Sequence, residues 1–389
     1  SSDLKIRGSW GLVGNDATNA GRFAYMEDLV LGGSDSYTTG IRQDTYYSGP
    51  SWNRYFNPDL TWEVGEKINL GLDLQLFNDF NLTFDIFREK RRDIFMTREN
   101  SIPEIVGTGE TKITSNNGEM ENKGLDLAID YNKQITKDFF LSFKSTLTFA
   151  RNKVLKMDEP PYFEYPGLSD VGHPLGTYWG YVADGLFPDQ ETIDNSPRQD
   201  LGYTPQPGDI KYVNQPNAKG EYDNVINSND RVAIGHPYDP ELVYGFGPSM
   251  KWKNWDFSFF FQGVARTSFM MYGMHPFGTT SIKNMLQFVA DDHWSVDNPN
   301  PNAAYPRLTK DSNGNNDQYS TYWLRNAAFL KLKNAEIGYT YKGMRFYLSG
   351  VNLLTFSPFK HWDPEMGGGN GLYYPTQRVF NIGFQMTIQ

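Results

Sequence analysis

The chain has 389 residues, 46 of them acidic and 36 basic, and its formal net charge is −10. Because the neutralisation of phosphates needs a basic surface, this balance argues against a nucleic-acid partner. Cysteine is absent and apolar runs are short, which excludes disulfides, thiol chemistry, zinc–thiolate sites and transmembrane helices, but not a membrane β-barrel.

Alternating apolar and polar residues recur from the start of the chain. The first such stretch is 4–14, and in 67–77 every second residue from Ile68 to Leu76 is apolar. A period of two is typical of β-strands with one apolar face. Further stretches are 80–86, 125–131, 141–149, 255–261, 344–348 and the C-terminal one. Together with the segments 243–252 and 328–341, which lie between a predicted long loop and a predicted turn, the pattern predicts ten strands. The phase slips between Leu332 and Ala335, which predicts a β-bulge there.

The last predicted strand, 379–389, continues the alternation to the final residue. In an antiparallel sheet we expect it to pair on one side with residues near 344–353. Its other edge would need a strand that this chain does not contain, and an open edge is costly in lipid and prone to aggregation in water. We therefore expect the chain not to be stable alone, and we expect lipid contacts from Phe380, Ile382, Phe384, Met386 and Ile388.

The connections between the predicted strands are of two kinds. Tight turns are predicted at 78–79, 132–138, 253–254 and 342–343, mostly flanked by aromatic residues. Long loops are predicted at about 15–63, 95–122, 153–242, 265–327 and 354–376. Short turns at one rim, long loops at the other and aromatics at strand ends are typical of an outer-membrane barrel. A large soluble all-β protein is the alternative, although such long connections are uncommon in compact soluble domains.

The long loops concentrate aromatic residues beside amides and acids, notably at 46–56, 160–167, 176–187 and 359–375. Flat aromatic faces with neighbouring carboxylates and amides suit sugars, and equally suit peptides. For any single residue the alternative is packing of the loops on one another. The predicted substrate contacts are Trp52, Tyr55, Tyr165, Trp179, Trp362 and Asp363.

Motifs for catalysis or metal binding do not emerge from the sequence. The nucleophile motif G-x-S-x-G, the phosphate loop G-x-x-x-x-G-K-[ST] and the zinc motif H-E-x-x-H do not occur. The stretch 208–231 is rich in acids and amides but lacks the D-x-[DN]-x-[DN]-G spacing of a calcium loop. The sequence therefore predicts no enzymatic activity, no cofactor and no metal.

Several stretches resemble SusC/RagA-type TonB-dependent outer-membrane transporters of Bacteroidetes. They include NPDLTWEVGEKINLGLDLQLF (57–77), NKGLDLAIDY (122–131), STYWLRNAAFLKLKNAEIGYT (320–340) and VNLLTFSPFKHWDPE (351–365). The resemblance implies an all-β transmembrane antiparallel barrel of roughly 22 strands with a plug inside. Residues 1–389 would supply about ten C-terminal strands of this one barrel domain. The plug, the TonB box and the early strands would lie outside the chain.

The resemblance also implies a function and partners. The transporter would import oligomeric nutrients, with glycans the first expectation, across the outer membrane. A SusD-like surface lipoprotein would act as a lid, and TonB–ExbB–ExbD would supply energy through the N-terminal part. Oligopeptide import by the same mechanism and a non-transporting outer-membrane adhesin or binding protein remain alternatives.

This sequence departs from the family pattern at two places. Residues 209–231 lack the acids of a D-x-N-G-D-G loop, which puts a family-like metal site in doubt. The chain ends at Gln389, whereas outer-membrane barrels usually end in an aromatic residue.

Overall fold

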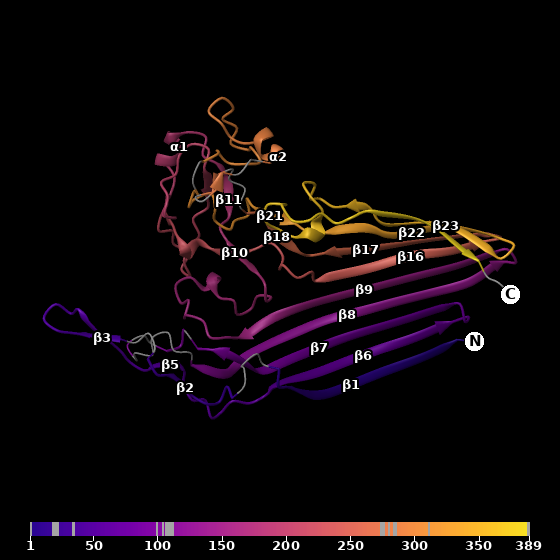
Figure 1. Cartoon of the computed structure of the whole chain (residues 1–389), viewed down its shortest axis with the longest axis horizontal. Helices are drawn as coiled ribbons and strands as arrows, with labels where there is room; N and C mark the ends of the chain where they lie inside the picture. The colour runs from indigo at the N-terminus through magenta and orange to yellow at the C-terminus, as the bar shows by residue number, and fades with distance from the viewer. Residues whose placement is uncertain are drawn as a thin grey trace.

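The computed structural model describes residues 2–17, 23–32, 36–98, 100–102, 105, 113–272, 277–278, 281–282, 286–309 and 312–386. Within these residues, ten long strands form one antiparallel sheet in chain order (Figure 1). The strands are β1 (Asp3–Asn15), β6 (Glu63–Leu76), β7 (Phe80–Thr97), β8 (Thr114–Thr136), β9 (Phe139–Lys156), β16 (Leu242–Trp252), β17 (Trp255–Ala265), β22 (Phe329–Tyr341), β23 (Met344–Phe356) and β24 (Val379–Met386). The ten predicted strands are confirmed.

Three strand ends differ from the sequence prediction. β7 continues to Thr97 and β8 already begins at Thr114, so the connection predicted at 95–122 is shortened to 98–113. The added part of β8 has no apolar alternation, and ion pairs to β7 such as Lys90–Glu119 at 2.9 Å hold it instead. β8 also runs on to Thr136, which narrows the turn predicted at 132–138.

The register of the sheet shows the predicted β-bulge. Leu332 and Asn334 lie opposite Leu354 and Val351 of β23, and the register shifts between them. The pairing of β22 with β17 shifts at the same place. Relative to β17 the extra residue lies on β22, whereas in the pairing with β23 it lies on β23. These bulges interrupt the alternation of faces where the sequence phase slips.

The C-terminal strand lies where the sequence predicts. β24 pairs with β23 from Val351 opposite Val379 to Met344 opposite Met386. Phe380, Ile382, Phe384 and Met386 are all exposed, and Ile388 lies outside the described residues. In the described sheet β1 and β24 are the two edge strands and do not pair with each other. The instability of the isolated chain stays a prediction that these open edges support.

The sheet has one apolar and one polar face. The alternate residues Leu4, Ile6 and Trp10 of β1 are exposed on the apolar face. On the other face the Arg7 guanidinium lies 2.8 Å from Asp73 and 3.0 Å from Asp85. We call these the outer and the inner face. Among the described residues, helices long and apolar enough to span a membrane are not found.

A second region, the loop layer, consists of the described parts of 157–241, 266–328 and 357–378. It stands at the end of the sheet opposite the short turns (Figure 1). Its elements are η2 (Pro166–Leu168), β10 (Tyr178–Gly180), β11 (Ala183–Leu186), α1 (Gln190–Asp194), β12 (Arg198–Gln199), β13 (Ile210–Tyr212), β14 (Val225–Ile226), η3 (Ser228–Asp230), β15 (Val232–Ile234), β18 (Ser268–Met270), β19 (Phe277–Gly278), β20 (Ser281–Ile282), α2 (Gln287–Asp291), β21 (Leu324–Asn326) and η4 (Pro364–Met366). The buried hydrophobic cluster of the molecule lies here, around Ile210, Tyr212, Phe269 and Tyr305.

A third region, the rim arm, is the described part of 16–62. It contains β2 (Asp28–Val30), β3 (Ser36–Thr39), β4 (Thr45–Ser48) and β5 (Ser51–Arg54), paired as β2 with β5 and β3 with β4. The β3 end of the arm projects away from the sheet (Figure 1). Its apolar side chains, such as Leu31 and Tyr46, are mostly exposed.

Candidate functional site

A buried carboxylate organises the centre of the loop layer. Asp209 is fully buried, and its Oδ1 accepts hydrogen bonds from Arg307 Nε at 2.7 Å, Asn313 Nδ2 at 2.9 Å and Asn316 Nδ2 at 2.8 Å. Its Oδ2 accepts from the Gln206 backbone N–H at 2.8 Å. This one side chain therefore ties 206–209 to a segment about a hundred residues later in the chain.

The residue before Asp209 explains how the chain can turn into this position. Gly208 has a φ of +87°, and a Cβ on it would overlap the ring of Trp294. Only glycine satisfies both the left-handed backbone and the close approach of the indole. The sequence Pro-Gly-Asp at 207–209 is thus a local requirement of the site.

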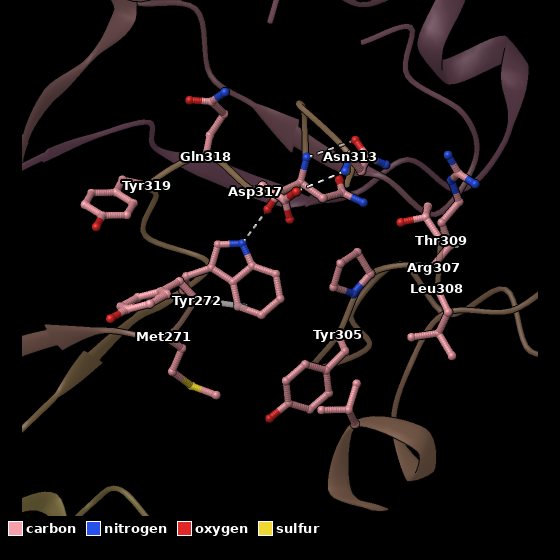
Figure 2. A pocket seen from close by; sticks show the side chains of 14 residues that line it. Met271, Tyr272, Tyr305, Arg307, Leu308, Thr309, Asn313, Asp317, Gln318 and Tyr319 are labelled. Carbon is pink, nitrogen blue, oxygen red and sulfur yellow. Dashed lines mark hydrogen bonds between the residues drawn. The ribbon is translucent and has the colours of Figure 1, made fainter. Parts of the chain in front are cut away.

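Next to the Asp209 network lies a cavity of about 200 Å³ (Figure 2). Tyr272, Tyr305 and Trp323 give it aromatic walls. The rest of its lining consists of Met271, Val289, Pro306, Arg307, Leu308, Thr309, Asn313, Asn316, Asp317, Gln318 and Tyr319. Sites for drug-sized ligands typically measure about 300–1,000 Å³. The cavity therefore suits one ring or one side chain of a longer ligand.

Hydrogen bonds fix several cavity walls in place. Trp323 donates from Nε1 to the carbonyl oxygen of Asn316 at 2.6 Å, and Asp317 accepts from the backbone N–H of Asn313 at 3.0 Å. Burial raises the pKa of the Tyr305 phenol, which therefore stays protonated and able to donate. An aromatic slot with amide and carboxylate groups beside it can hold a ligand that has both apolar faces and hydroxyl or amide groups.

The predicted contacts Trp52 and Tyr55 lie together on the rim arm. Their rings stack with centroids 5.7 Å apart. Tyr165 precedes η2 in the loop layer, and burial together with the nearby Asp223 raises its pKa. Trp179 lies on β10 and donates from Nε1 to Asp170 at 2.6 Å. Trp52 and Tyr55 thus form a stacked pair on the rim arm, while Tyr165 and Trp179 lie in the loop layer.

Trp362 and Asp363 are engaged with their own chain. The Trp362 ring packs at 4.6 Å from Phe359, and its Nε1 donates to the carbonyl oxygen of Gly367 at 2.9 Å. Asp363 lies 2.5 Å from the Nζ of Lys331, which is completely buried. Burial opposes ionisation of Asp363, but the bond to Lys331 and the backbone hydrogen bond from Glu365 together lower its pKa. A ligand contact by either side chain stays a prediction, and the cavity lining includes none of the six predicted residues.

The acid-rich stretch 208–231 uses its carboxylates internally. Asp230 accepts backbone hydrogen bonds from Gln215 at 2.7 Å and Asn227 at 2.8 Å, and Asp223 accepts one from Val225 at 3.0 Å. In the part of the chain that the structure describes, groups of three or more His, Asp or Glu that could hold a metal ion are not found.

The cavity is not among the sequence predictions, because its walls come from distant segments. Tyr272, Tyr305 and Trp323 are brought together only by the folding of the loop layer. A usable signal is the run SNGNNDQYSTYW at 312–323, where amides that can build a hydrogen-bonded wall precede aromatic residues.

Comparisons with known proteins agree with the fold described above. The family described as "TonB dependent receptor-like, beta-barrel" matches residues 18–353. TonB-dependent receptor P26 of Formosa agariphila and TonB-dependent receptor SusC of Bacteroides thetaiotaomicron are each 28% identical over 99% of this chain. The matches cover 40% and 37% of these relatives, so the chain spans about two fifths of their length.

A solved structure of the RagAB peptide transporter shares the fold. It superposes with a TM-score of 0.72 at 22% identity, over 99% of this chain and 41% of that one. The RagAB peptide importer in its open-open state gives a TM-score of 0.73 at 21% identity, over 99% of this chain and 40% of that one.

Proposed function

Because this chain belongs to the family of TonB-dependent receptor-like β-barrels, its sheet is part of an outer-membrane barrel, and we propose that it forms the C-terminal barrel part of a SusC/RagA-type importer of oligomeric nutrients. The substrate class we propose is oligosaccharides. The remaining strands of the same barrel would pair with the open edges of β1 and β24. A plug, outside residues 1–389, would close the barrel interior.

In this proposal the long loops capture the substrate together with a lid. A SusD-like surface lipoprotein would cover the loop layer and the rim arm, and TonB–ExbB–ExbD would pull on the plug to open a path. The loops suit the first step because they stand at the rim opposite the short turns (Figure 1). Uptake through such a receptor involves no bond chemistry on the substrate.

The observation that carries the choice of glycans is the cavity of Figure 2. Tyr272, Tyr305 and Trp323 offer flat apolar surfaces, while Asn313 and Asp317 lie beside them. Sugar rings present C–H faces that pack on aromatic rings and hydroxyls that bond to amides and carboxylates. We propose that Trp52, Tyr55, Tyr165 and Trp179 contribute further contacts, and that Trp362 and Asp363 contribute by holding the 357–378 loop.

Oligopeptide import is the second candidate. It is supported by the peptide transporter RagAB, with which the chain shares its fold at 22% identity. An aromatic cavity with neighbouring amides is also compatible with a peptide side chain. A non-transporting outer-membrane adhesin is the third candidate, and a plug and TonB box in the rest of the protein would argue against it.

Calorimetry of the intact receptor with its lid lipoprotein separates these candidates. We expect oligosaccharides to bind and the Tyr272→Ala variant to weaken that binding about fivefold to tenfold, because it removes one stacking face. Phe163→Ala is the matched control, since Phe163 is an exposed loop aromatic outside the cavity lining. Binding of oligopeptides without oligosaccharides would overturn the glycan proposal. Binding without uptake into proteoliposomes energised through TonB would favour the adhesin.

A further inference from the structure

The outer face of the sheet changes character along β7, β8 and β9. Ile86, Leu125 and Phe149 are register partners and form one apolar row across the three strands. Two residues further toward the long loops, the register partners are Arg88, Lys123 and Arg151. Because side chains on one face recur every second residue, this basic row lies on the same outer face, directly beyond the apolar row.

The basic row is exposed and has an energetic cost. The side chains of Arg88, Lys123 and Arg151 are 51%, 58% and 55% exposed. Like charges directly opposite each other on neighbouring strands destabilise a sheet. Three cations side by side therefore carry a cost that neighbouring carboxylates have to offset.

The carboxylates near this row neutralise only part of its charge. Glu121 lies between Arg88 at 2.6 Å and Lys123 at 2.7 Å. Glu241 is shared in the same way by Arg151 at 3.0 Å and Arg266 at 2.6 Å. Each carboxylate thus faces two cations, and each group keeps one positive charge in excess.

Two more cations extend this positive surface. The Arg266 guanidinium lies 5.9 Å from the ring centre of Phe149, which places it over the apolar row. Lys153, opposite Glu121 in the register, has no ion pair within 4 Å among the described residues. We call Arg88, Lys123, Arg151, Lys153 and Arg266 the outer basic patch. It stands out on a chain whose net charge is −10.

We propose that the outer basic patch binds the phosphate-bearing headgroup of a lipid in the outer leaflet. Such a lipid presents its acyl chains and its anionic group in the order in which the strands present the apolar and the basic row. The three basic side chains of the row span about 10 Å, since neighbouring strands lie about 4.8 Å apart. Arginine forks bind phosphate oxygens in pairs, and the acyl chains would pack against Ile86, Leu125 and Phe149. This site is on the lipid side of the barrel and is independent of the substrate cavity.

The test uses the intact receptor in nanodiscs of phosphatidylcholine that contain a small fraction of bisphosphorylated lipid A. Native mass spectrometry counts the lipid A molecules released with each receptor. We expect the variant R88Q/K123Q/R151Q to bind lipid A at least about tenfold more weakly, because each cation near an anionic surface contributes substantially to binding. Raising the salt concentration should weaken binding to the wild type and leave the variant nearly unchanged.

The matched control removes the same charge from the opposite face. K67Q/K144Q/K251Q changes three inner-face lysines of the same sheet and should bind lipid A like the wild type. The variant R88K/K123R/R151K keeps the charges and should retain binding. K123Q/K153Q disturbs fewer ion pairs and should still lose binding about threefold, and heat-modifiable migration on gels checks that each barrel is folded.

Three results would overturn the proposal. One is equal loss of lipid A in the outer and inner triple variants. Another is unchanged binding in R88Q/K123Q/R151Q when its barrel is folded. The third is inorganic phosphate binding as tightly as lipid A to the receptor in detergent, which would assign the patch to a free anion.

Discussion

The sheet and the loop layer place their apolar side chains in opposite ways. On the outer face of the sheet Ile382 is 88% exposed and Ile6 is 70% exposed. In the loop layer Ile210 and Ile226 are completely buried, and Phe187 and Met271 nearly so. The sheet therefore depends on lipid to cover its apolar surface, whereas the loop layer covers its own. The long connections fold as a water-facing domain carried on a membrane scaffold.

One ion cluster joins the two regions. Lys331 lies near the loop end of β22 and is completely buried, at 2.5 Å from both Asp363 and Glu365 of the loop layer. Lys333 adds a second contact to Glu365 at 2.6 Å. These ion pairs therefore fix the loop 357–378 to the sheet. They hold the loop layer, which has its own core, at the rim.

The largest effect that separates the two regions is expected at Asp209. The Asp209→Ala variant leaves the mostly buried Arg307 without its carboxylate and removes the acceptor of two asparagine side chains. Removing one partner of a buried ion pair typically costs about 3–5 kcal/mol. We expect the loop layer to open, seen as fast amide exchange in 206–210, 305–309 and 312–316, while the barrel strands stay protected.

Asp200→Ala is the control for this substitution, because Asp200 forms an exposed pair with Arg198 at 3.2 Å. Exposed pairs contribute about 0–1 kcal/mol, so exchange should hardly change. Loss of protection in β6–β9 together with the loop layer would contradict the view that the loop layer has a core of its own.

A smaller effect is expected from a charge on the outer face of the sheet. Ile382→Arg puts a cation on a lipid-facing position, where arginine costs up to about 2–4 kcal/mol at the membrane midplane and less near its surfaces. Asn381→Arg, one residue earlier on the inner face, should cost much less. Folding titrations in lipid vesicles measure both free energies. Equal costs would mean that lipid does not cover this face.

The sequence predicts the sheet well because each of its strands carries its own signal. In 67–77 the alternation alone assigns a strand and its apolar face, and the phase slip near Leu332 reveals the bulge. The start of β8 could not be predicted in the same way, because ion pairs such as Lys90–Glu119 replace the apolar alternation there. The cavity could not be predicted, because Tyr272, Tyr305 and Trp323 meet only through long-range packing of the loops.

The predicted contact residues show the same limit. Trp362 and Asp363 have the composition of a binding site, yet Trp362 packs on Phe359 and Asp363 pairs with Lys331 of the same chain. An aromatic residue next to a carboxylate in the sequence is found both in ligand-binding surfaces and in loops that pack on themselves. The sequence alone does not distinguish the two.

The smallest expected effect is a pH dependence confined to the loop layer. The ring of His361 stacks 4.2 Å from Phe288 and lies 3.3 Å from the Tyr305 hydroxyl. Burial and the nearby Arg325 lower the pKa of His361 below its usual value of about 6.5. A lowered pKa in the folded state means that its contribution to stability is present above pH 6.5 and is lost as the pH falls through the folded-state pKa. Since the side chain is partly exposed, the loss of stability should stay below about 1 kcal/mol.

Amide exchange of 286–309 at pH 7.5 and pH 5.0 measures this loss. The His361→Gln variant should lack the part of the pH dependence that comes from His361. The same pH dependence in that variant would assign it to another group, and an equal change in the barrel strands would remove the distinction between the two regions.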